Sequence, residues 1–252
     1  MDLQLNGTRV LVTGGTRGIG RAIVAAFLDE GAVVGFCARE PEEVAATEKA
    51  LQDRGKVVGS VLDVGDGEAL ASWVEESADA FGGLDVVVAN VSALAIPDTE
   101  ENWQASFNVD LMHTVRLVRA AMPHLERSKA ASIIAISSVS GRESDFASGP
   151  YGTAKTAIVG YINGLALQLA EKGIRANTVS PGNTYFEGGV WASIESGNPD
   201  LFTMAVGLNP TGHMGAPEEV APAVVFLASP VARRISGTNL VVDGALTRGI
   251  QL

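Results

Sequence analysis

The sequence has few of the residues on which disulfide frameworks, metal centres and membrane anchors depend. Its 252 residues include one cysteine, Cys37, and three scattered histidines. A lone cysteine cannot form an internal disulfide, and separate histidines give no metal-ligand spacing. No apolar run reaches the ~18 residues that span a bilayer, and the first residues lack the basic and apolar regions of a signal peptide. We therefore expect a soluble cytoplasmic protein without a metal site.

Basic residues are also scarce. The chain has 18 lysines and arginines against 29 acidic residues, a formal net charge of −11. This charge repels a phosphate backbone, so neither nucleic acid nor a membrane is an expected partner. Hydrophobic residues make up 46% of the chain, which is enough for one well-buried domain.

Short apolar runs alternate with longer amphipathic stretches along the whole chain. The predicted strands are Arg9–Thr13, Val33–Cys37, Val57–Leu62, Asp85–Ala89, Ser132–Ser137, Arg175–Ser180 and Asn239–Val242. The predicted helices are Gly18–Asp29, Pro41–Asp53, Gly67–Phe81, Glu101–Leu125, Pro150–Glu171 and Pro217–Leu227. The strands are continuous Val, Ile and Leu runs, as burial on both faces requires. We expect an α/β fold: a single Rossmann-like domain over residues 1–252, with a doubly wound, parallel seven-stranded sheet and helices on both faces.

One interval, residues 182–215, contains none of these elements. It is rich in glycine, asparagine and aromatic residues. A loop of this length inside a compact domain usually covers or binds something. We predict that it forms a lid over the substrate.

A glycine-rich turn, Thr13-Gly-Gly-Thr-Arg-Gly-Ile-Gly20, follows the first strand and opens the first helix. Glycines in such a turn let a pyrophosphate approach the backbone N–H groups, and the helix N-terminus adds partial positive charge. The strand–turn–helix context distinguishes the turn from an ordinary connection and predicts a dinucleotide site. The expected cofactor contacts in it are Gly14, Thr16, Arg17, Gly18, Ile19 and Gly20.

The end of the second strand predicts which dinucleotide binds. NAD-selective sites usually carry an acidic residue there, to bind the ribose 2′-hydroxyl. This chain has Ala38 followed by Arg39, and Arg17 lies inside the glycine turn. Two guanidinium groups and no carboxylate suit a 2′-phosphate, so we predict NADP(H).

Tyr151 and Lys155 are four residues apart on a predicted helix and therefore share one face. An ammonium group beside a phenol favours the phenolate and makes a tyrosine usable as an acid or base near neutral pH. Ser138, at the end of the fifth predicted strand, can hydrogen-bond a carbonyl or alcohol oxygen. These three residues predict a carbonyl/alcohol redox site.

Together, these residues resemble the short-chain dehydrogenase/reductase family, from about residue 5 to the C-terminus. The branch that includes 3-oxoacyl-carrier-protein reductases and many secondary-alcohol dehydrogenases is the most similar. The matching pieces are the glycine turn, Asp63-Val64, Asn90, Ser138, Tyr151-Gly-Thr-Ala-Lys155, Asn177, Pro181-Gly182 and Val242-Asp-Gly244. Their shared order and spacing are more specific than any single piece.

The resemblance implies a role for each matching residue. Asp63 and Val64 would hold the adenine, Asn90 would line the cofactor cleft, and Tyr151 and Lys155 would also contact the cofactor. The residues expected against the nicotinamide are Pro181, Gly182 and Thr184. Taken singly, Asp63 could instead cap a helix, and Asn90 could stabilise a strand end.

Two positions depart from the family pattern. The usual Asn-Asn-Ala-Gly is replaced by Ala89-Asn-Val-Ser92, and Asp110 stands where a fourth catalytic residue, asparagine, is common. In the family that asparagine is thought to bend its helix so that a main-chain carbonyl holds a water beside the lysine. Because aspartate has a similar shape, we expect Asp110 to serve the same relay and Asp110→Asn to retain most activity.

The predicted substrate pocket is mostly apolar. Its expected wall residues are Ser92, Leu94, Phe146, Tyr185, Phe186, Val190, Trp191 and Met204. No lysine or arginine occurs between Arg175 and Arg233, so a small anionic substrate would find no cationic clamp in the lid. An apolar ketone fits better, as does an acyl chain whose charged carrier stays outside.

Three functional hypotheses remain. The first is an NADP(H)-dependent oxidoreductase that interconverts a ketone and a secondary alcohol. The second is a 3-oxoacyl-thioester reductase, for which Arg127, Lys129 and Lys172 could offer a basic edge to an acidic carrier, although solvated helix ends explain them as well. The third is a non-catalytic dinucleotide sensor, which would not need Ser138, Tyr151 and Lys155 together. The resemblance also implies a homotetramer.

The first prediction concerns the cofactor. Ala38→Asp introduces a carboxylate at the strand end, where it accepts a hydrogen bond from a ribose 2′-hydroxyl and repels a 2′-phosphate. The ratio of kcat/KM with NADPH to kcat/KM with NADH should shift toward NADH. A variant that still strongly prefers NADPH contradicts this assignment of the pocket.

Overall fold

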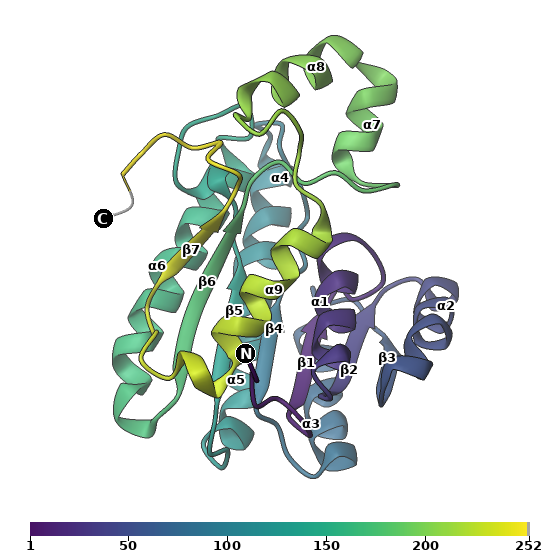
Figure 1. Cartoon of the computed structure of the whole chain (residues 1–252), viewed down its shortest axis with the longest axis vertical. Coiled ribbons are helices and arrows are strands. Elements are labelled where there is room, and N and C mark those ends of the chain that lie inside the picture. The colour runs from purple at the N-terminus through teal and green to yellow at the C-terminus, as the bar shows by residue number, and fades with distance from the viewer. Residues whose placement is uncertain (251–252) are drawn as a thin grey trace.

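The computed structural model describes residues 1–250. Seven strands form one parallel sheet in the order β3-β2-β1-β4-β5-β6-β7 (Figure 1). The strands are β1 (Arg9–Thr13), β2 (Val33–Ala38), β3 (Val57–Val61), β4 (Val86–Ala89), β5 (Ser132–Ile136), β6 (Arg175–Pro181) and β7 (Asn239–Val242). The order reverses between β1 and β4, and ligands of such sheets bind in the crevice at that switch point. The predicted fold class is confirmed.

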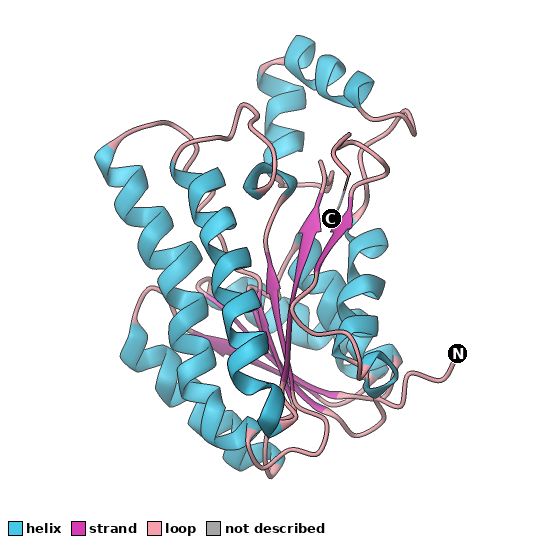
Figure 2. Ribbon diagram, turned by 90° about the vertical axis from the view of Figure 1, so that its left-hand side faces the viewer, coloured by secondary structure: helices cyan, strands magenta, loops and turns pink. Residues whose placement is uncertain are grey.

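Helices cover both faces of the sheet (Figure 2). The helices are α1 (Gly18–Asp29), α2 (Pro41–Leu51), α3 (Gly67–Phe81), α4 (Glu100–Ala105), α5 (His113–Leu125), α6 (Pro150–Leu169), α7 (Val190–Gly197), α8 (Pro199–Leu208) and α9 (Pro217–Ala228). Helices α1, α2 and α9 share one apolar core with one side of the sheet, and α3, α5 and α6 share a second core with the other. Strands β4 and β5 are buried along their whole length, which explains their unbroken apolar sequences.

The helix predicted over residues 101–125 is not one regular helix. A π-helical segment, Ser106–Met112, separates α4 from α5. Inside it, Asp110 is completely buried, and its main-chain carbonyl accepts a hydrogen bond from Thr114 Oγ1 at 2.9 Å. Short π-helical stretches within α-helices often mark functional sites. Apolar periodicity alone could not reveal the wider turn, since it continues through the segment.

Residues 182–215 contain two helices, α7 and α8, where the sequence analysis predicted a loop. Pro199 opens α8, and the Asn198 side chain caps it by accepting a hydrogen bond from Leu201 N at 3.2 Å. The two helices pack around a small core of their own, which includes Trp191, Ala205 and Met214. They are drawn in green beyond the carboxyl ends of the strands (Figure 1). The segment is therefore folded around apolar contacts of its own. We keep the name lid for residues 182–215, whose role as a lid stays a prediction.

Two further observations concern the bulk of the chain. Within residues 1–250, no helix combines the length and the apolar character that crossing a membrane requires. Cys37 lies buried on β2, where burial raises the pKa of its thiol to about 12. The thiol is therefore neutral and shielded at physiological pH.

Candidate active site

A cleft of about 810 Å³ opens at the carboxyl ends of the strands. Its walls come from the glycine turn, the ends of β2, β3, β4, β5 and β6, the first turns of α6, and the lid. Of the predicted site residues, it is lined by Gly14, Thr16, Arg17, Ile19, Gly20, Ala38, Arg39, Asp63, Val64, Asn90, Ser92, Leu94, Ser138, Phe146, Tyr151, Lys155, Pro181, Gly182, Thr184, Phe186 and Trp191. The fold thus gathers most of the predicted residues at one cleft.

The glycine turn is held rigid by its neighbours. A side chain at Gly20 would place its Cβ 2.0 Å from the carbonyl oxygen of Gly14, so only glycine fits there. Asn90 Nδ2 donates hydrogen bonds to the carbonyl oxygens of Thr13, at 3.0 Å, and Gly14, at 3.3 Å. Asn90 therefore fixes the turn to the end of β4 in addition to lining the cleft.

The start of α1 suits a bound anion. Arg17, the N-cap residue, makes no side-chain capping hydrogen bond, and the first turn contains no acidic residue. The N–H groups at this helix end thus have no side-chain cap, and no acidic residue of the first turn offsets the positive end of the helix dipole. These features fit the pyrophosphate of a dinucleotide.

The adenosine end of the cleft combines expected and unexpected residues. Arg17 and Arg39 are both exposed at its edge. Asp63 accepts a hydrogen bond from Gly65 N at 2.8 Å, whereas Asp66 caps α3. The capping alternative for Asp63 is therefore excluded. Glu43, which the sequence analysis missed, lines the cleft and accepts a hydrogen bond from Thr16 Oγ1 at 3.0 Å.

Ser138 is brought to the helix that carries Tyr151 by two close backbone approaches. A Cβ at Gly152 would lie 2.8 Å from the carbonyl oxygen of Ser140, and a Cβ at Gly141 would lie 2.8 Å from the carbonyl carbon of Lys155. Since only glycine allows these contacts, the turn after β5 packs directly on α6. Ser138 Oγ accepts a hydrogen bond from Ser140 N at 3.1 Å, which leaves its own hydrogen available to a ligand.

Tyr151 and Lys155 lie on the same side of α6, as the i, i+4 spacing predicts. The Lys155 ammonium is 5.6 Å from the centroid of the Tyr151 ring. Lys155 is only 2% exposed, and Nζ donates a hydrogen bond to the carbonyl oxygen of Ile136 at 3.0 Å. Ser137 Oγ also donates to the carbonyl oxygen of Lys155 at 2.9 Å, which fixes the helix to β5.

Comparison with known proteins agrees with this geometry. Residues 14–247 match the family model described as enoyl-(acyl carrier protein) reductase, adh_short_C2. An isoepoxydon dehydrogenase of Penicillium expansum is 42% identical, over 98% of this chain and 97% of its own. A 3-oxoacyl-[acyl-carrier-protein] reductase of Vibrio harveyi is 32% identical, over 97% and 99%.

The chain belongs to the short-chain dehydrogenase/reductase family. Among solved structures, L-sorbose reductase of Gluconobacter frateurii, complexed with NADPH and L-sorbose, matches with a TM-score of 0.92 at 25% identity, over 99% of this chain and 100% of that one. An NADPH-bound short-chain oxidoreductase of Pseudomonas aeruginosa, described as containing an atypical catalytic center, matches with a TM-score of 0.87 at 29% identity, over 96% and 98%.

The side of the cleft that was predicted to hold the substrate is lined by aromatic and apolar groups. The rings of Phe146 and Trp191 meet edge to face, with centroids 5.7 Å apart, and so connect the loop before α6 to the lid. Leu94 is 45% exposed in a left-handed conformation, with φ of 49°, and its N–H donates to Ser92 Oγ at 3.0 Å. Ile96 and Val190 also line this side, and the sequence analysis did not place Ile96 there.

Four predicted site residues do not line the cleft: Gly18, Asp110, Tyr185 and Met204, the last of which is 59% exposed on α8. The Tyr185 hydroxyl donates to Glu195 at 2.6 Å and its ring packs on Phe202, so the side chain belongs to the lid and not to the pocket wall. Gly18 is covered by the ring of Phe186. Asp110 lies behind Lys155. Among residues 1–250, no three His, Cys, Asp or Glu side chains come together as a metal site.

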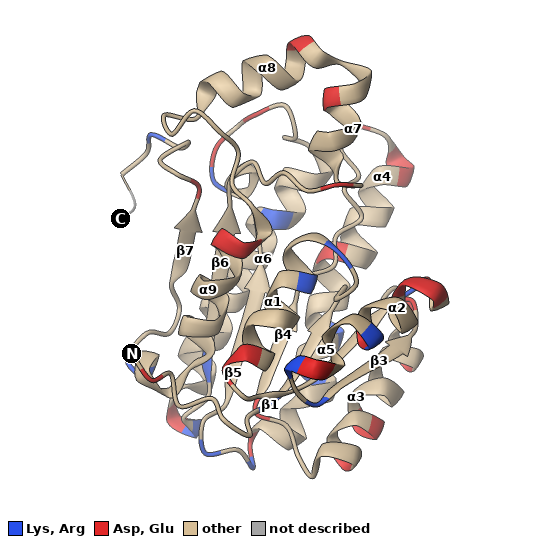
Figure 3. Cartoon of the chain, turned by 45° about the vertical axis from the view of Figure 1, so that its right-hand side comes forward, with Lys and Arg blue, Asp and Glu red and all other residues tan. Residues whose placement is uncertain are grey.

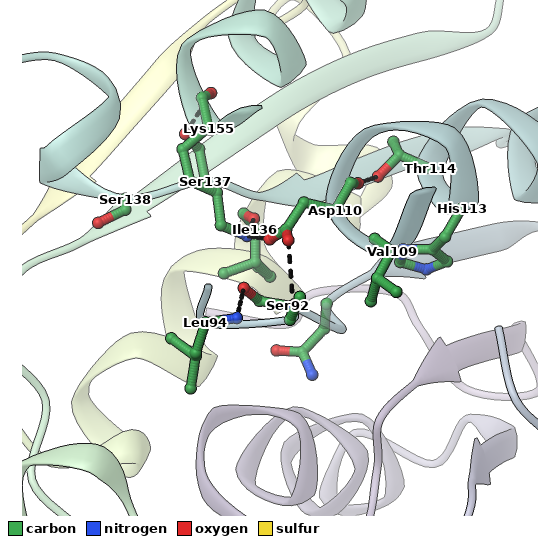
Figure 4. A network of polar contacts seen from close by, with 12 residues as sticks. Ser92, Leu94, Val109, Asp110, His113, Thr114, Ile136, Ser137, Ser138 and Lys155 are labelled. Carbon is green, nitrogen blue, oxygen red and sulfur yellow. Dashed lines mark hydrogen bonds and ion pairs between the residues drawn. The ribbon is translucent and has the colours of Figure 1, made fainter. Parts of the chain in front are cut away.

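Asp110 contacts Lys155 directly (Figure 4). Its Oδ1 is 3.2 Å from Lys155 Nζ, an ion pair whose angle is too bent to count as a hydrogen bond, and its Oδ2 accepts from Ala93 N at 3.1 Å. The carboxylate thus joins the lysine to the loop after β4. In the family pattern the asparagine acts through its main-chain carbonyl, whereas here the side chain itself reaches the lysine.

His113, one turn after Asp110, is buried and not catalytic in this geometry. Its Nε2 lies 3.0 Å from Thr13 Oγ1, and Nδ1 lies 2.9 Å from the carbonyl oxygen of Val109. Burial lowers the pKa of the imidazole to about 4, so the ring is neutral at pH 7. It links the π-helical segment to the end of β1.

The second prediction concerns Asp110. Asparagine can keep the bond from Ala93 N through its amide oxygen, but its NH₂ group would then face the Lys155 ammonium, and two donors repel. The direct ion pair therefore revises the expectation from sequence: Asp110→Asn should lower kcat by about tenfold or more, because a buried charge loses its partner. The ketone KM should change less than kcat.

Thr114→Val is the matched control. It removes the hydroxyl that contacts the Asp110 carbonyl but keeps the carboxylate. Steady-state kinetics and thermal unfolding of both variants separate a specific effect on turnover from a general loss of stability. Near-normal kcat in Asp110→Asn would show that the carboxylate charge is dispensable.

Proposed function

We propose that the protein is an NADP(H)-dependent oxidoreductase that interconverts a ketone and a secondary alcohol on a small uncharged substrate. The observation that carries this proposal is the position of Ser138, Tyr151 and Lys155 in the cleft that also contains the glycine turn. A dinucleotide sensor would need the turn but not the other three residues. The membership of the chain in an oxidoreductase family supports the same conclusion.

The preference for NADP(H) rests on charge at the adenosine end. Arg17 and Arg39 offer two guanidinium groups, and β2 ends in Ala38, not in an acidic residue. Glu43 is held by Thr16, so its carboxylate has a partner within the protein. The L-sorbose reductase and the Pseudomonas aeruginosa oxidoreductase were both solved with NADPH.

In the proposed mechanism, Ser138 and Tyr151 act on the substrate oxygen, and Lys155 acts on Tyr151. Bound NADP(H) would supply or accept the hydride. Ser138 Oγ donates a hydrogen bond to the carbonyl oxygen, and Tyr151 gives this oxygen its phenolic proton. In the reverse direction, Tyr151 takes the proton from the alcohol. Lys155, held by Ile136 and Asp110, places its ammonium group beside the Tyr151 ring.

The substrate is expected to be uncharged. Helices α7 and α8 carry acidic residues but no lysine or arginine (Figure 3). The residues of α7 that line the cleft, Val190 and Trp191, are apolar or aromatic. An anionic group would therefore meet no counter-charge from these two helices. The L-sorbose reductase described above acts, by its name, on an uncharged sugar. We propose that the substrate of this protein is likewise uncharged.

The 3-oxoacyl-thioester alternative has one supporting relative, the Vibrio harveyi reductase. The basic edge proposed for a carrier lies far from the cleft, because Arg127 and Lys172 follow helices that end at the opposite, amino end of the sheet. Lys172 is also paired with Glu126, and Arg127 donates to His124. The geometry thus favours a free small molecule over a carrier-bound acyl chain.

We propose that the protein assembles as a homotetramer through the faces of α4, the π-helical segment and α6. Trp103 and Phe107 are 41% and 58% exposed there. A shallow apolar groove runs beside them, lined in part by Leu111 and Pro150. Exposed apolar side chains grouped in this way are typical of subunit interfaces.

The third prediction tests the chemistry. Tyr151→Phe removes the proton that the carbonyl oxygen receives, so kcat should fall by roughly 10²–10⁴-fold, while NADPH titration should show nearly unchanged binding. Tyr161→Phe, on the same helix but outside the cleft, is the control and should leave kcat unchanged. Near-normal turnover in Tyr151→Phe would rule out the scheme.

The fourth prediction tests the substrate class. Initial rates of NADPH oxidation with uncharged cyclic ketones, a ketose, an aryl ketone, acetoacetyl thioester and a 2-oxo acid should rank the uncharged ketones first. Higher kcat/KM with the thioester supports the carrier-linked alternative. NADPH binding without turnover on any ketone would support the sensor hypothesis.

A further inference from the structure

We infer that Phe186 of the lid retains the cofactor, by covering the outer side of the glycine turn at Gly18. The sequence analysis placed this ring on the substrate wall. Its contacts instead place it against the turn that is expected to hold the pyrophosphate. The inference rests on the proposed binding of NADP(H) in this cleft, and it adds a residue that controls how fast the cofactor leaves.

The contact with Gly18 is close. A Cβ built on Gly18 would lie 2.5 Å from Phe186 Cζ and 2.7 Å from Cε1, so the ring fits directly against the bare backbone. At Gly14 and Gly20, a Cβ atom would meet Asn90, Val91 or the backbone of the turn itself. At Gly18, a Cβ atom would meet a residue of the lid. The turn and the lid are therefore in direct contact.

The position of Phe186 is fixed by the backbone on both sides of it. Tyr185 N donates to the carbonyl oxygen of Gly215 at 2.8 Å, and Gly215 N donates to the carbonyl oxygen of Asn183 at 2.9 Å. These bonds join the two ends of the lid in a short parallel bridge. After Phe186 the chain turns back sharply, with Gly189 N donating to the Phe186 carbonyl oxygen at 3.0 Å.

A second glycine, in the turn that follows Phe186, also packs on the ring. A Cβ on Gly189 would lie 2.9 Å from Phe186 Cζ, so the tip of the ring contacts two glycines, Gly18 and Gly189. Both glycines are needed for this arrangement, because any larger residue would displace the ring. Phe186 thus connects the base of the lid to the N-terminus of α1.

The consequence for the cofactor follows from this position. A pyrophosphate bound at the glycine turn lies next to Gly18, and the ring closes that side against water. A contact between charged groups becomes stronger when water is excluded from it, because the local dielectric constant falls. For the dinucleotide to leave, the lid must separate from Gly18, and lid opening often limits ligand release. Phe186 is therefore a positioning residue for the cofactor and not a substrate contact.

The test measures NADPH binding directly, without turnover. In stopped-flow experiments that follow NADPH fluorescence, displacement by excess NADP⁺ gives the dissociation rate. Phe186→Ala should raise this rate on the order of tenfold, with a smaller change in the association rate, since interface mutations act mainly on dissociation. Phe186→Leu, which keeps part of the apolar contact, should give an intermediate rate.

Met204→Ala is the matched control. Met204 is a 59% exposed lid residue on α8 that does not line the cleft, so its loss should leave the NADPH dissociation rate unchanged. Circular dichroism and thermal unfolding verify that each variant is folded.

Three outcomes would overturn the inference: an unchanged dissociation rate in Phe186→Ala, an equal increase in Met204→Ala, or a rise in ketone KM alone. Failure of the wild-type protein to bind NADPH would instead reject the proposed function itself.

Discussion

The arrangement of the site depends on one buried ammonium group. Lys155 has almost no contact with solvent, and a carbonyl oxygen from β5 and a carboxylate from the π-helical segment hold its charge. A charge without such partners would be very costly to bury. Because each partner comes from a different element, the requirement fixes α6, β5 and the segment around Asp110 relative to one another. Tyr151 and Ser138 take their positions from the same contacts.

Glycines make the required approach distances possible. Gly141 and Gly152 allow the turn after β5 to pack against α6, and Gly20 allows the phosphate turn to fold back against the carbonyl oxygen of Gly14. In both places a single methyl group would collide with backbone atoms, which cannot move aside as the end of a side chain can. Backbone packing therefore shapes both the part of the cleft around Ser138 and Tyr151 and the part around the glycine turn.

The lid contributes a different kind of interaction. Its helices have their own small core, and aromatic rings connect it to the body of the protein: Trp191 to Phe146 on the substrate side, and Phe186 to Gly18 on the cofactor side. Apolar contacts between preformed surfaces can separate and re-form without breaking hydrogen-bonded structure. This organisation suits the proposed role of the lid, which is to admit and release the cofactor and the substrate.

The amino-acid sequence by itself determined the alternation of strands and helices, the parallel sheet and most residues of the cleft. These features follow from local signals: apolar runs for β4 and β5, glycine spacing for the turn, and the i, i+4 spacing of Tyr151 and Lys155. Tertiary structure alone decided the rest. The ion pair of Asp110 with Lys155 joins residues 45 positions apart, and the contact of Phe186 with Gly18 joins residues 168 positions apart. The π-helical segment depends on the burial of Asp110. No local pattern encodes such contacts, because their energy arises only when packing removes water from both partners.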